Sequence, residues 1–267
     1  MTSLSTIDAW PSPTAAGAVI GPDGAIASHG PTTHPFALAS ITKLFTAAAV
    51  HLAIEEGTLG LDQEVDDRGA TIADLLAHAS GLAPDGSVLS EPGRRRIYSN
   101  AAYDRLADAL EASAGMPFAD YLRDGVFAAL GMDTARLTGS PAYAAVASVD
   151  DLTRFLVGLP RLLAPETRAA MTTVYLPELV GVLPGYGRQS PNPWGLGPEI
   201  RGDKSPHWTG STNSPATWGH FGQAGTFVWW DPEVSVGLIV LTDLAFGEWA
   251  MSRWSTLSDE VRSEVLG

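Results

Sequence analysis

The residues best suited to chemistry in this sequence are a serine and a lysine three positions apart, Ser40 and Lys43. Residues i and i+3 of an α-helix lie on one face, so the Ser40 hydroxyl and the Lys43 ammonium should be neighbours. A hydroxyl is a poor nucleophile until a base takes its proton, and a desolvated lysine can be that base. The spacing therefore indicates a serine nucleophile, although a serine that begins a helix is also an ordinary N-cap.

A second polar group, Tyr98-Ser99-Asn100, stands just before a predicted helix. The Tyr98 phenol can relay a proton if a nearby cation lowers its pKa. Asn100 offers a donor and an acceptor, which suits it to orient a lysine and a substrate carbonyl. Taken alone, the group also fits a helix N-cap at Ser99 or Asn100 beside a packed aromatic side chain.

A third group, His220-Phe221-Gly222-Gln223, precedes a predicted strand hairpin. A strand edge beside a helix N-terminus can supply one backbone N–H, and the nucleophile's own N–H supplies another, which together make an oxyanion hole. Gly222 would let a substrate approach the backbone closely. The plainer alternative is a histidine before a glycine-rich turn.

Composition excludes several classes of function. The formal net charge of -14 argues against a nucleic-acid partner, and the absence of cysteine removes thiol catalysis and disulfides. No histidine and carboxylate set has metal-ligand spacing, and no nucleotide-binding loop is present, so we expect neither metal nor cofactor. We find no signal peptide and no apolar run long enough to span a membrane, so we expect a cytoplasmic protein without a membrane partner.

The predicted elements fall into three blocks. Strands over residues 16–20 and 25–28 precede a helix from Ser40 to about Glu56, and the last third holds a hairpin at 226–230 and 234–241 and a terminal helix at 247–266. The middle third is expected to contain helices only, with no strand between about 62 and 164. Helices are expected at 72–78, 100–114, 117–130 and 150–159, and a further short helix follows at 165–172. Residues 209–217 are read as a mobile or lid-like loop.

This order predicts an α/β lobe, residues 1–61 and 165–267, interrupted by an all-helical lobe, residues 62–164, with the active site in the cleft between them. The predicted fold class is therefore α/β, or α+β. The fold alone says little about function, which has to be argued from the site.

The three groups in this order resemble the serine β-lactamase and penicillin-binding-protein superfamily, in particular the class C β-lactamase-like serine hydrolases that include the family VIII carboxylesterases. Four further segments are similar to ones typical of that family: residues 56–62, 75–82, 130–134 and 194–197. The resemblance runs from about Phe36 to Leu241. It implies a three-layer sandwich of a mainly antiparallel sheet flanked by helices, beside a helical lobe.

The resemblance also implies roles for these residues. Ser40 would be the acyl-enzyme nucleophile, Lys43 its proton acceptor, and Tyr98 a partner base that then donates a proton to the leaving group. Asn100 would hold the substrate or Lys43, and the N–H groups of Ser40 and Gln223 would form the oxyanion hole. His220 and Gly222 would line the substrate site, whereas we expect His78 to be structural.

One departure from the family bears on the substrate. The third motif is usually Lys-Thr-Gly, and this chain has His220 where the lysine would stand. A histidine is largely neutral near pH 7, so the case for an obligatory substrate carboxylate at that position weakens. We therefore predict a carboxylesterase-like serine hydrolase acting on small, uncharged acyl esters. The alternatives are a β-lactamase, a D-amino-acid amidase or DD-peptidase, an acyltransferase, or a non-catalytic sensor, and the oligomeric state is open.

Overall fold

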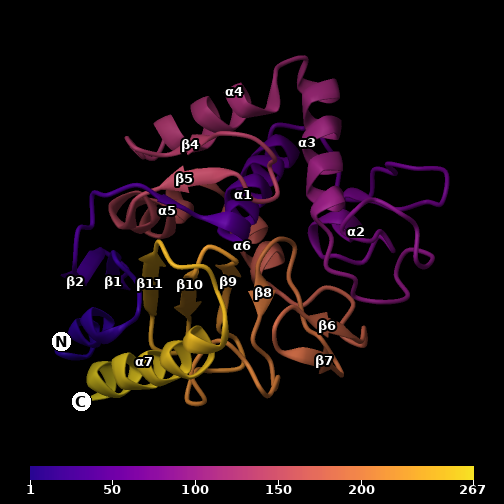
Figure 1. Ribbon diagram of the computed structural model, residues 1–267. Coiled ribbons are helices and arrows are strands. Elements are labelled where there is room, and N and C mark those ends of the chain that lie inside the picture. Colours follow the sequence, from indigo (N-terminus) through magenta and orange to yellow (C-terminus); the bar gives the residue numbers. More distant parts are fainter.

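The computed structural model describes residues 1–267, and its centre is an antiparallel sheet of six strands in the order β2-β1-β11-β10-β9-β8 (Figure 1). The strands are β1 Ala15–Gly21, β2 Gly24–His29, β8 Glu199–Ile200, β9 Trp218–Gly222, β10 Thr226–Asp231 and β11 Val236–Thr242. The N-terminal strand pairs directly with the C-terminal one, Ala18 opposite Ile239. The two ends of the chain are thereby joined into one sheet.

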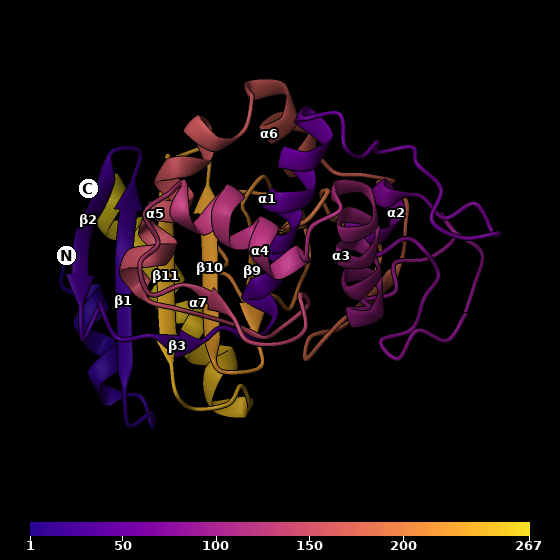
Figure 2. The same cartoon turned by 90° about the horizontal axis from the view of Figure 1, so that it is seen from above.

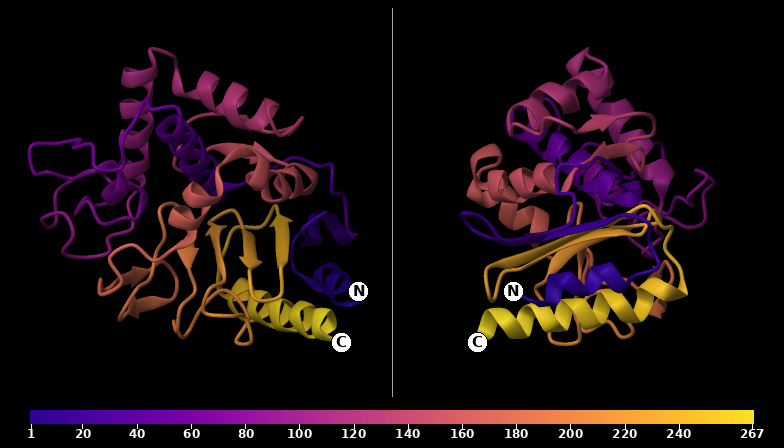
Figure 3. Two further views of the ribbon diagram at one scale, coloured as in Figure 1. Left: turned by 180° about the vertical axis from the view of Figure 1, so that it is seen from behind. Right: turned by 60° about the vertical axis from the view of Figure 1, so that its left-hand side comes forward.

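Helices cover both faces of this sheet (Figure 3). The turn η1 Ser3–Ala9 and helix α7 Glu248–Leu266 lie on one face, and α1 Thr42–Glu55, α5 Val149–Leu162 and α6 Pro165–Thr172 lie on the other. The alternation of strand side chains explains why both faces need cover. On β11, Ile239 and Leu241 belong to the core beneath α1 and α5, whereas Leu238 and Val240 belong to the core beneath α7. The predicted three-layer sandwich is confirmed.

A second group of helices packs beside α1 (Figure 2). It contains α2 Ile72–Leu76, α3 Asn100–Ala114, α4 Phe118–Leu122 and the π-helical turn η3 Arg123–Ala128. Side chains fix where these helices begin: Ser99 caps α3 by accepting from Ala102 N, and Thr71 with Asp74 forms a capping box on α2. The observed start and end of α3 match the predicted helix.

The expectation that the middle third contains no strand is wrong. Short strands β4 Arg136–Leu137 and β5 Ala145–Ala147 pair there with β3 Phe36–Ala37, the segment that leads to Ser40. Strands of two or three residues are too short to show a period in the sequence. Helix α5 also packs against β1, β2 and β11, so part of the segment 62–164 covers the main sheet. The lobe boundaries themselves stay a prediction.

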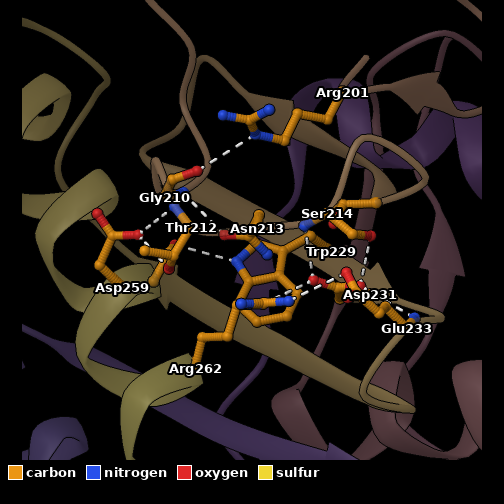
Figure 4. Close-up of polar contacts among 12 residues, drawn as sticks. Arg201, Gly210, Thr212, Asn213, Ser214, Trp229, Asp231, Glu233, Asp259 and Arg262 are labelled. Carbon is orange, nitrogen blue, oxygen red and sulfur yellow. Dashed lines mark hydrogen bonds and ion pairs between the residues drawn. The ribbon is translucent and has the colours of Figure 1, made fainter. Parts of the chain in front are cut away.

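The loop expected to be mobile or lid-like is fastened from two sides (Figure 4). Asp259 of α7 accepts hydrogen bonds from the backbone N–H and hydroxyl groups of Ser211 and Thr212. Asp231, at the end of β10, accepts from the N–H and hydroxyl of Ser214 and from Arg262. Serine and threonine are common in loops because they can make such bonds, so composition alone did not distinguish a tethered loop from a free one.

A short hairpin completes the frame of the site. It consists of β6 Gly181–Leu183 and β7 Gly187–Gln189 and lies beside α2 and the loop that precedes α3, where the backbones of Arg96 and Gly181 form a β-bridge.

None of the helices combines the length and the apolar character that crossing a bilayer requires.

Candidate active site

Ser40 lies in a 3-10 turn, η2 Ala39–Ile41, that runs directly into α1. The predicted helix therefore begins at Thr42, two residues later than expected. Ala39 has φ 47°, a left-handed conformation that is unusual for a residue other than glycine. Thr42 holds this turn: its hydroxyl donates to Ala39 O at 2.6 Å and accepts from Ala145 N at 2.9 Å. Strand β5 thus fixes the turn that presents Ser40.

Lys43 is fully buried and its ammonium makes three contacts. Nζ lies 3.4 Å from Ser40 Oγ, 2.7 Å from Asn100 Oδ1 and 2.8 Å from Ala142 O. It also lies 4.8 Å from the centre of the Tyr98 ring. The structure therefore brings Tyr98 and Asn100 next to Ser40 and Lys43, although the two pairs lie far apart in the sequence. No carboxylate forms an ion pair with Lys43.

Burial without a paired carboxylate sets the protonation of Lys43. Desolvation lowers the pKa of Lys43 from its ordinary 10.5 to about 7, and the more distant charge of Asp104 offsets only part of that shift. Near neutral pH a large share of this side chain is a free amine. A free amine has a lone pair that can accept the Ser40 proton.

Proton relay by Tyr98 was predicted on the condition that a nearby cation lowers its pKa. That condition is not met: burial raises the pKa of Tyr98 well above 10, and the Ser40 side chain offsets only part of that rise. The phenol therefore stays protonated and can donate a hydrogen bond or a proton. Its ring is packed between aromatic neighbours, with the His78 ring centre at 4.5 Å and those of Trp194 and His220 both at 5.9 Å.

His220, Gly222 and Gln223 reach the site at the end of β9. Burial lowers the pKa of His220 to about 3, with the charge of Lys43 adding to the effect, so the imidazole is neutral. Nδ1 lies 2.7 Å from Phe221 O; because a carbonyl only accepts, Nδ1 carries the proton and Nε2 keeps a lone pair. That Nε2 is buried without a partner, and the backbone N–H of Gln223 also donates to no group of the chain.

Gly222 was expected to let a substrate approach the backbone, and the structure shows a further reason for glycine at this position. A Cβ at this position would stand 2.2 Å from Leu38 O and 3.0 Å from Ala39 Cβ. Glycine is therefore required because β9 crosses directly against the turn that carries Ser40. Contact between Gly222 and a substrate stays a prediction.

Several residues near the site were not found by sequence reasoning. The Ala142 carbonyl binds Lys43, but a backbone acceptor leaves no signal in the sequence. The ring centre of Trp194 lies 5.9 Å from those of both Tyr98 and His220, and no pattern in the sequence distinguished this tryptophan from the others in the C-terminal third. His78, expected to be structural, is fully buried and accepts from Ser99 N at 3.2 Å. This bond fixes the start of α3 and so the positions of Tyr98 and Asn100.

The side chains enclose a small catalytic cavity of about 30 Å³. Its lining consists of Ser40, Tyr98, Leu183, Pro184, Trp194, His220, Phe221 and Gln223. The β6–β7 hairpin, through Leu183 and Pro184, closes one side of it. A larger pocket of about 420 Å³ beside α5 and α6 contains none of the candidate catalytic residues.

Comparison with solved structures finds the same architecture over the whole chain. A β-lactamase from Mycobacterium bovis is 47% identical, with a TM-score of 0.97 and 99% of each chain covered. A simvastatin synthase variant from Aspergillus terreus is 17% identical with a TM-score of 0.80, covering 99% of this chain and 98% of that one. EstCE1, a hydrolase with promiscuous acyltransferase activity, is 18% identical with a TM-score of 0.81, covering 97% and 96%. The last two likenesses concern the fold alone.

Two curated relatives match a shorter region. Penicillin-binding protein 4* of Bacillus subtilis is 32% identical over 40% of this chain and 31% of its own length. The D-alanyl-D-alanine-carboxypeptidase/endopeptidase AmpH of Escherichia coli is 27% identical over 39% of this chain and 37% of its own. The matched region thus spans about a third of each relative. The family model described as Beta-lactamase matches residues 15–261, nearly the entire chain, and the chain therefore belongs to the beta-lactamase family of serine hydrolases.

Proposed function

We propose that this chain hydrolyses small carboxylic esters through an acyl-enzyme on Ser40. The observation that carries the proposal is Lys43: a fully buried amine, unpaired with any carboxylate, with a pKa of about 7 and with Nζ 3.4 Å from Ser40 Oγ. A base whose pKa lies near the working pH combines the correct protonation state with a useful driving force.

In acylation, Lys43 takes the Ser40 proton while Oγ attacks the ester carbonyl carbon. The N–H groups of Ser40 and Gln223 receive the oxyanion, and the free N–H of Gln223 supports its part in this hole. When the intermediate collapses, the bond to the alcohol oxygen breaks. Tyr98, kept protonated by burial, gives its proton to that oxygen and regains one from the Lys43 ammonium.

Deacylation runs the same groups in reverse. Lys43, neutral again, removes a proton from a water molecule, whose oxygen attacks the acyl carbonyl. Collapse of this second intermediate breaks the bond to Ser40 Oγ, which recovers a proton from Lys43. Asn100 contributes by holding Nζ at 2.7 Å throughout, which keeps the amine directed at Ser40.

Two features support small, uncharged groups at the reacting end of the substrate. His220 is neutral with a pKa of about 3, so the position that holds a permanent positive charge in relatives with Lys-Thr-Gly has none here. The cavity of about 30 Å³ next to Ser40 is only about two to three times the ~10–15 Å³ that one water molecule needs. About two or three acyl carbons fill that space, so a branched or bulky group next to the carbonyl does not suit it and any longer chain must leave the cavity.

The test is Ser40→Ala against Ser252→Ala, an exposed serine on α7 that serves as the matched control. With p-nitrophenyl acetate we expect Ser40→Ala to lose about three or more orders of magnitude in kcat, as for loss of a covalent nucleophile, while the control keeps wild-type turnover. A fluorophosphonate probe followed by mass spectrometry should label Ser40 in the control and in the wild type. Retained turnover in Ser40→Ala, or no adduct on Ser40, would contradict the proposal and favour a non-catalytic sensor.

β-Lactam hydrolysis is the second candidate, and the 47% identity to the M. bovis β-lactamase over 99% of the chain favours it. The chemistry at Ser40 would be the same, with a ring amide in place of the ester. Nitrocefin measured beside p-nitrophenyl acetate separates the two, and D-alanyl peptides and an added alcohol acceptor extend the comparison to peptidase and acyl-transfer activity. A larger kcat/KM for nitrocefin than for every ester would replace our first proposal by the second.

A further inference from the structure

A large groove adjoins the catalytic cavity. It has a volume of about 700 Å³, and Tyr98 and Pro184 line both spaces, so the groove opens directly beside the reacting atoms. Its walls come from the loop before α3 and from the β6–β7 hairpin. Leu89 and Val182 are each 59% exposed, a large exposure for apolar side chains. An apolar wall of this kind beside a nucleophile suits a chain-like part of a substrate.

Two arginines, Arg95 and Arg188, also line the groove, one from each wall. Both are exposed, and neither makes an ion pair or a side-chain hydrogen bond with the rest of the chain. In a chain with a formal net charge of -14, guanidinium groups have many carboxylates available as partners. Arg68, Arg123 and Arg262, for example, all form ion pairs. The groove therefore carries two cations whose fork-shaped donors are free.

The third arginine at the groove, Arg96, holds its walls together. It is 2% exposed and donates to four carbonyl oxygens, among them Ala77 O at 2.7 Å and Tyr175 O at 2.6 Å. These bonds tie the segment that carries Arg95 to the segments on either side. Its donors are used inside the protein, so Arg96 does not compete for a ligand.

The catalytic cavity itself offers no permanent positive charge. His220 is neutral, and Lys43 must be an amine to act as a base. An anionic group on a substrate would therefore find its complementary charges in the groove, away from the scissile bond. Guanidinium groups bind carboxylates through paired, charge-assisted hydrogen bonds, which favours a carboxylate as the group recognised.

We propose that the groove binds the distal part of the ester substrate, an apolar chain that ends in a carboxylate held by Arg95 and Arg188. The proposal rests on the ester hydrolysis proposed above and makes its substrate class more specific. A neutral ester group reacts at Ser40, and a carboxylate further along the substrate binds in the groove. It differs from recognition at the Lys-Thr-Gly position, because Arg95 lies before α3 and Arg188 on β7, whereas His220 lies on β9.

The test compares matched pairs of p-nitrophenyl esters. One member of each pair is a half-ester of a dicarboxylic acid, from succinic to sebacic, and the other is the neutral ester of equal chain length. In the wild type, kcat/KM should favour the anionic member at one chain length. In Arg95→Gln and Arg188→Gln we expect that preference to fall about tenfold, through KM, with the neutral ester changed less than about twofold.

Matched controls and a second arm make the outcome decisive. Arg253→Gln removes an exposed charge from α7 and should leave the preference intact. The pair 4-acetoxybenzoate and phenyl acetate places the carboxylate on the leaving group instead. A loss confined to either anionic series supports the proposal and says on which side of the scissile bond the anion lies. No loss in either series, or an equal loss for anionic and neutral members, overturns it.

A measurement without turnover separates this proposal from the one on which it rests. In Ser40→Ala, titration calorimetry measures the dissociation constants of the monomethyl half-esters and of the corresponding neutral methyl esters. Their ratio gives the preference for the anionic member without any turnover. If no ester is hydrolysed by the wild type but the half-ester still binds through Arg95 and Arg188, the groove assignment stands and ester hydrolysis fails. If Ser40 is active and the half-ester binds no better than its neutral partner, the groove assignment fails alone.

Discussion

The chain has two lysines, both buried, and they lie in opposite electrostatic surroundings. Lys204, 3% exposed, forms an ion pair with Glu199 and also donates to Pro193 O at 3.0 Å. Glu199 accepts further bonds from His207 Nε2 at 2.9 Å and Trp208 Nε1 at 2.6 Å. Lys43 is equally buried, but its strong acceptors are an amide oxygen and a backbone carbonyl. One site pairs its charge and the other does not.

The difference decides what each lysine can do. Burial would raise the pKa of Glu199, but the charges of Lys204 and His207 outweigh it and lower that pKa to about 2, so the pair stays ionised. Burial also lowers the pKa of Lys204, but there the charge and the hydrogen bond of Glu199 oppose the shift; at Lys43 only the distant charge of Asp104 opposes it, and the pKa falls to about 7. A buried lysine paired with a carboxylate is therefore suited to be a structural cation, and one without such a partner is suited to act as a base. The Trp194 ring contacts both surroundings: its centre lies 5.5 Å from Lys204 Nζ and 5.9 Å from the ring centre of Tyr98.

The largest effect that tests this contrast is expected for Lys43→Met. Removing the base should lower kcat for p-nitrophenyl acetate by about two to four orders of magnitude, the usual contribution of a positioned general base. The methionine side chain fills a similar volume and needs no hydrogen bond, so the fold should persist. Circular dichroism and the melting temperature check that the loss is chemical, and Lys43→Met with near-normal turnover would assign the base to another group.

The same variant should change how stability depends on pH. Because the folded-state pKa of Lys43 is lowered from 10.5 to about 7, the unfolded chain binds more protons between these two values. Below about pH 7 both states carry the proton, so the folded state bears the whole cost of a buried, desolvated ammonium; this cost shrinks as pH rises across the window and is gone above the unfolded pKa. Lys43→Met lacks this cost, so it should be more stable than the wild type at pH 6, and the advantage should shrink toward pH 10. An equal difference at both pH values would contradict an unpaired, desolvated lysine.

At the paired site the expected effect falls on stability. Lys204→Met leaves the Glu199 carboxylate buried without its lysine partner, and breaking a buried pair costs about 3–5 kcal/mol. We expect a clear fall in the free energy of unfolding in urea, with kcat for the folded fraction within about tenfold of the wild type. The double variant Lys204→Met with Glu199→Gln removes the orphaned charge and should recover part of the loss. A Lys204→Met protein as stable as the wild type would mean that the pair contributes little.

The sequence predicted Lys43 as the candidate base, but it could not predict the surroundings that lower the pKa of this lysine. Spacing along a helix placed Ser40 and Lys43 together because that contact is local. Resemblance added Tyr98 and Asn100. The Ala142 carbonyl depends on strands β4 and β5, which are too short to leave a pattern, and the absence of a carboxylate beside Nζ is a property of the folded chain only.

Protonation was the weakest part of the sequence-based interpretation. Proton relay by Tyr98 was tied to a lowered pKa, yet its packing against His78, Trp194 and His220 desolvates the phenol and raises the pKa instead. Proximity of residues can be inferred from motifs, whereas desolvation depends on every neighbour at once. The Thr209–Thr217 loop shows the same limit, since the carboxylates that tether it come from β10 and α7.

The smallest effect, and the finest test of the contrast, concerns Asp104. Its charge raises the pKa of Lys43 without an ion pair, from a position held by the Ser140 hydroxyl at 2.6 Å. In the wild type, log kcat/KM should rise with pH and level off near pH 7, as the Lys43 amine forms. In Asp104→Asn the loss of this negative charge should move that midpoint to lower pH by about half a unit, the size of a weak charge–charge interaction. Asp108→Asn, an exposed change one turn further along α3, should leave the midpoint in place. Because a structural fault at Asp104 would lower the plateau without moving the midpoint, the midpoint alone reports whether a distant carboxylate tunes Lys43.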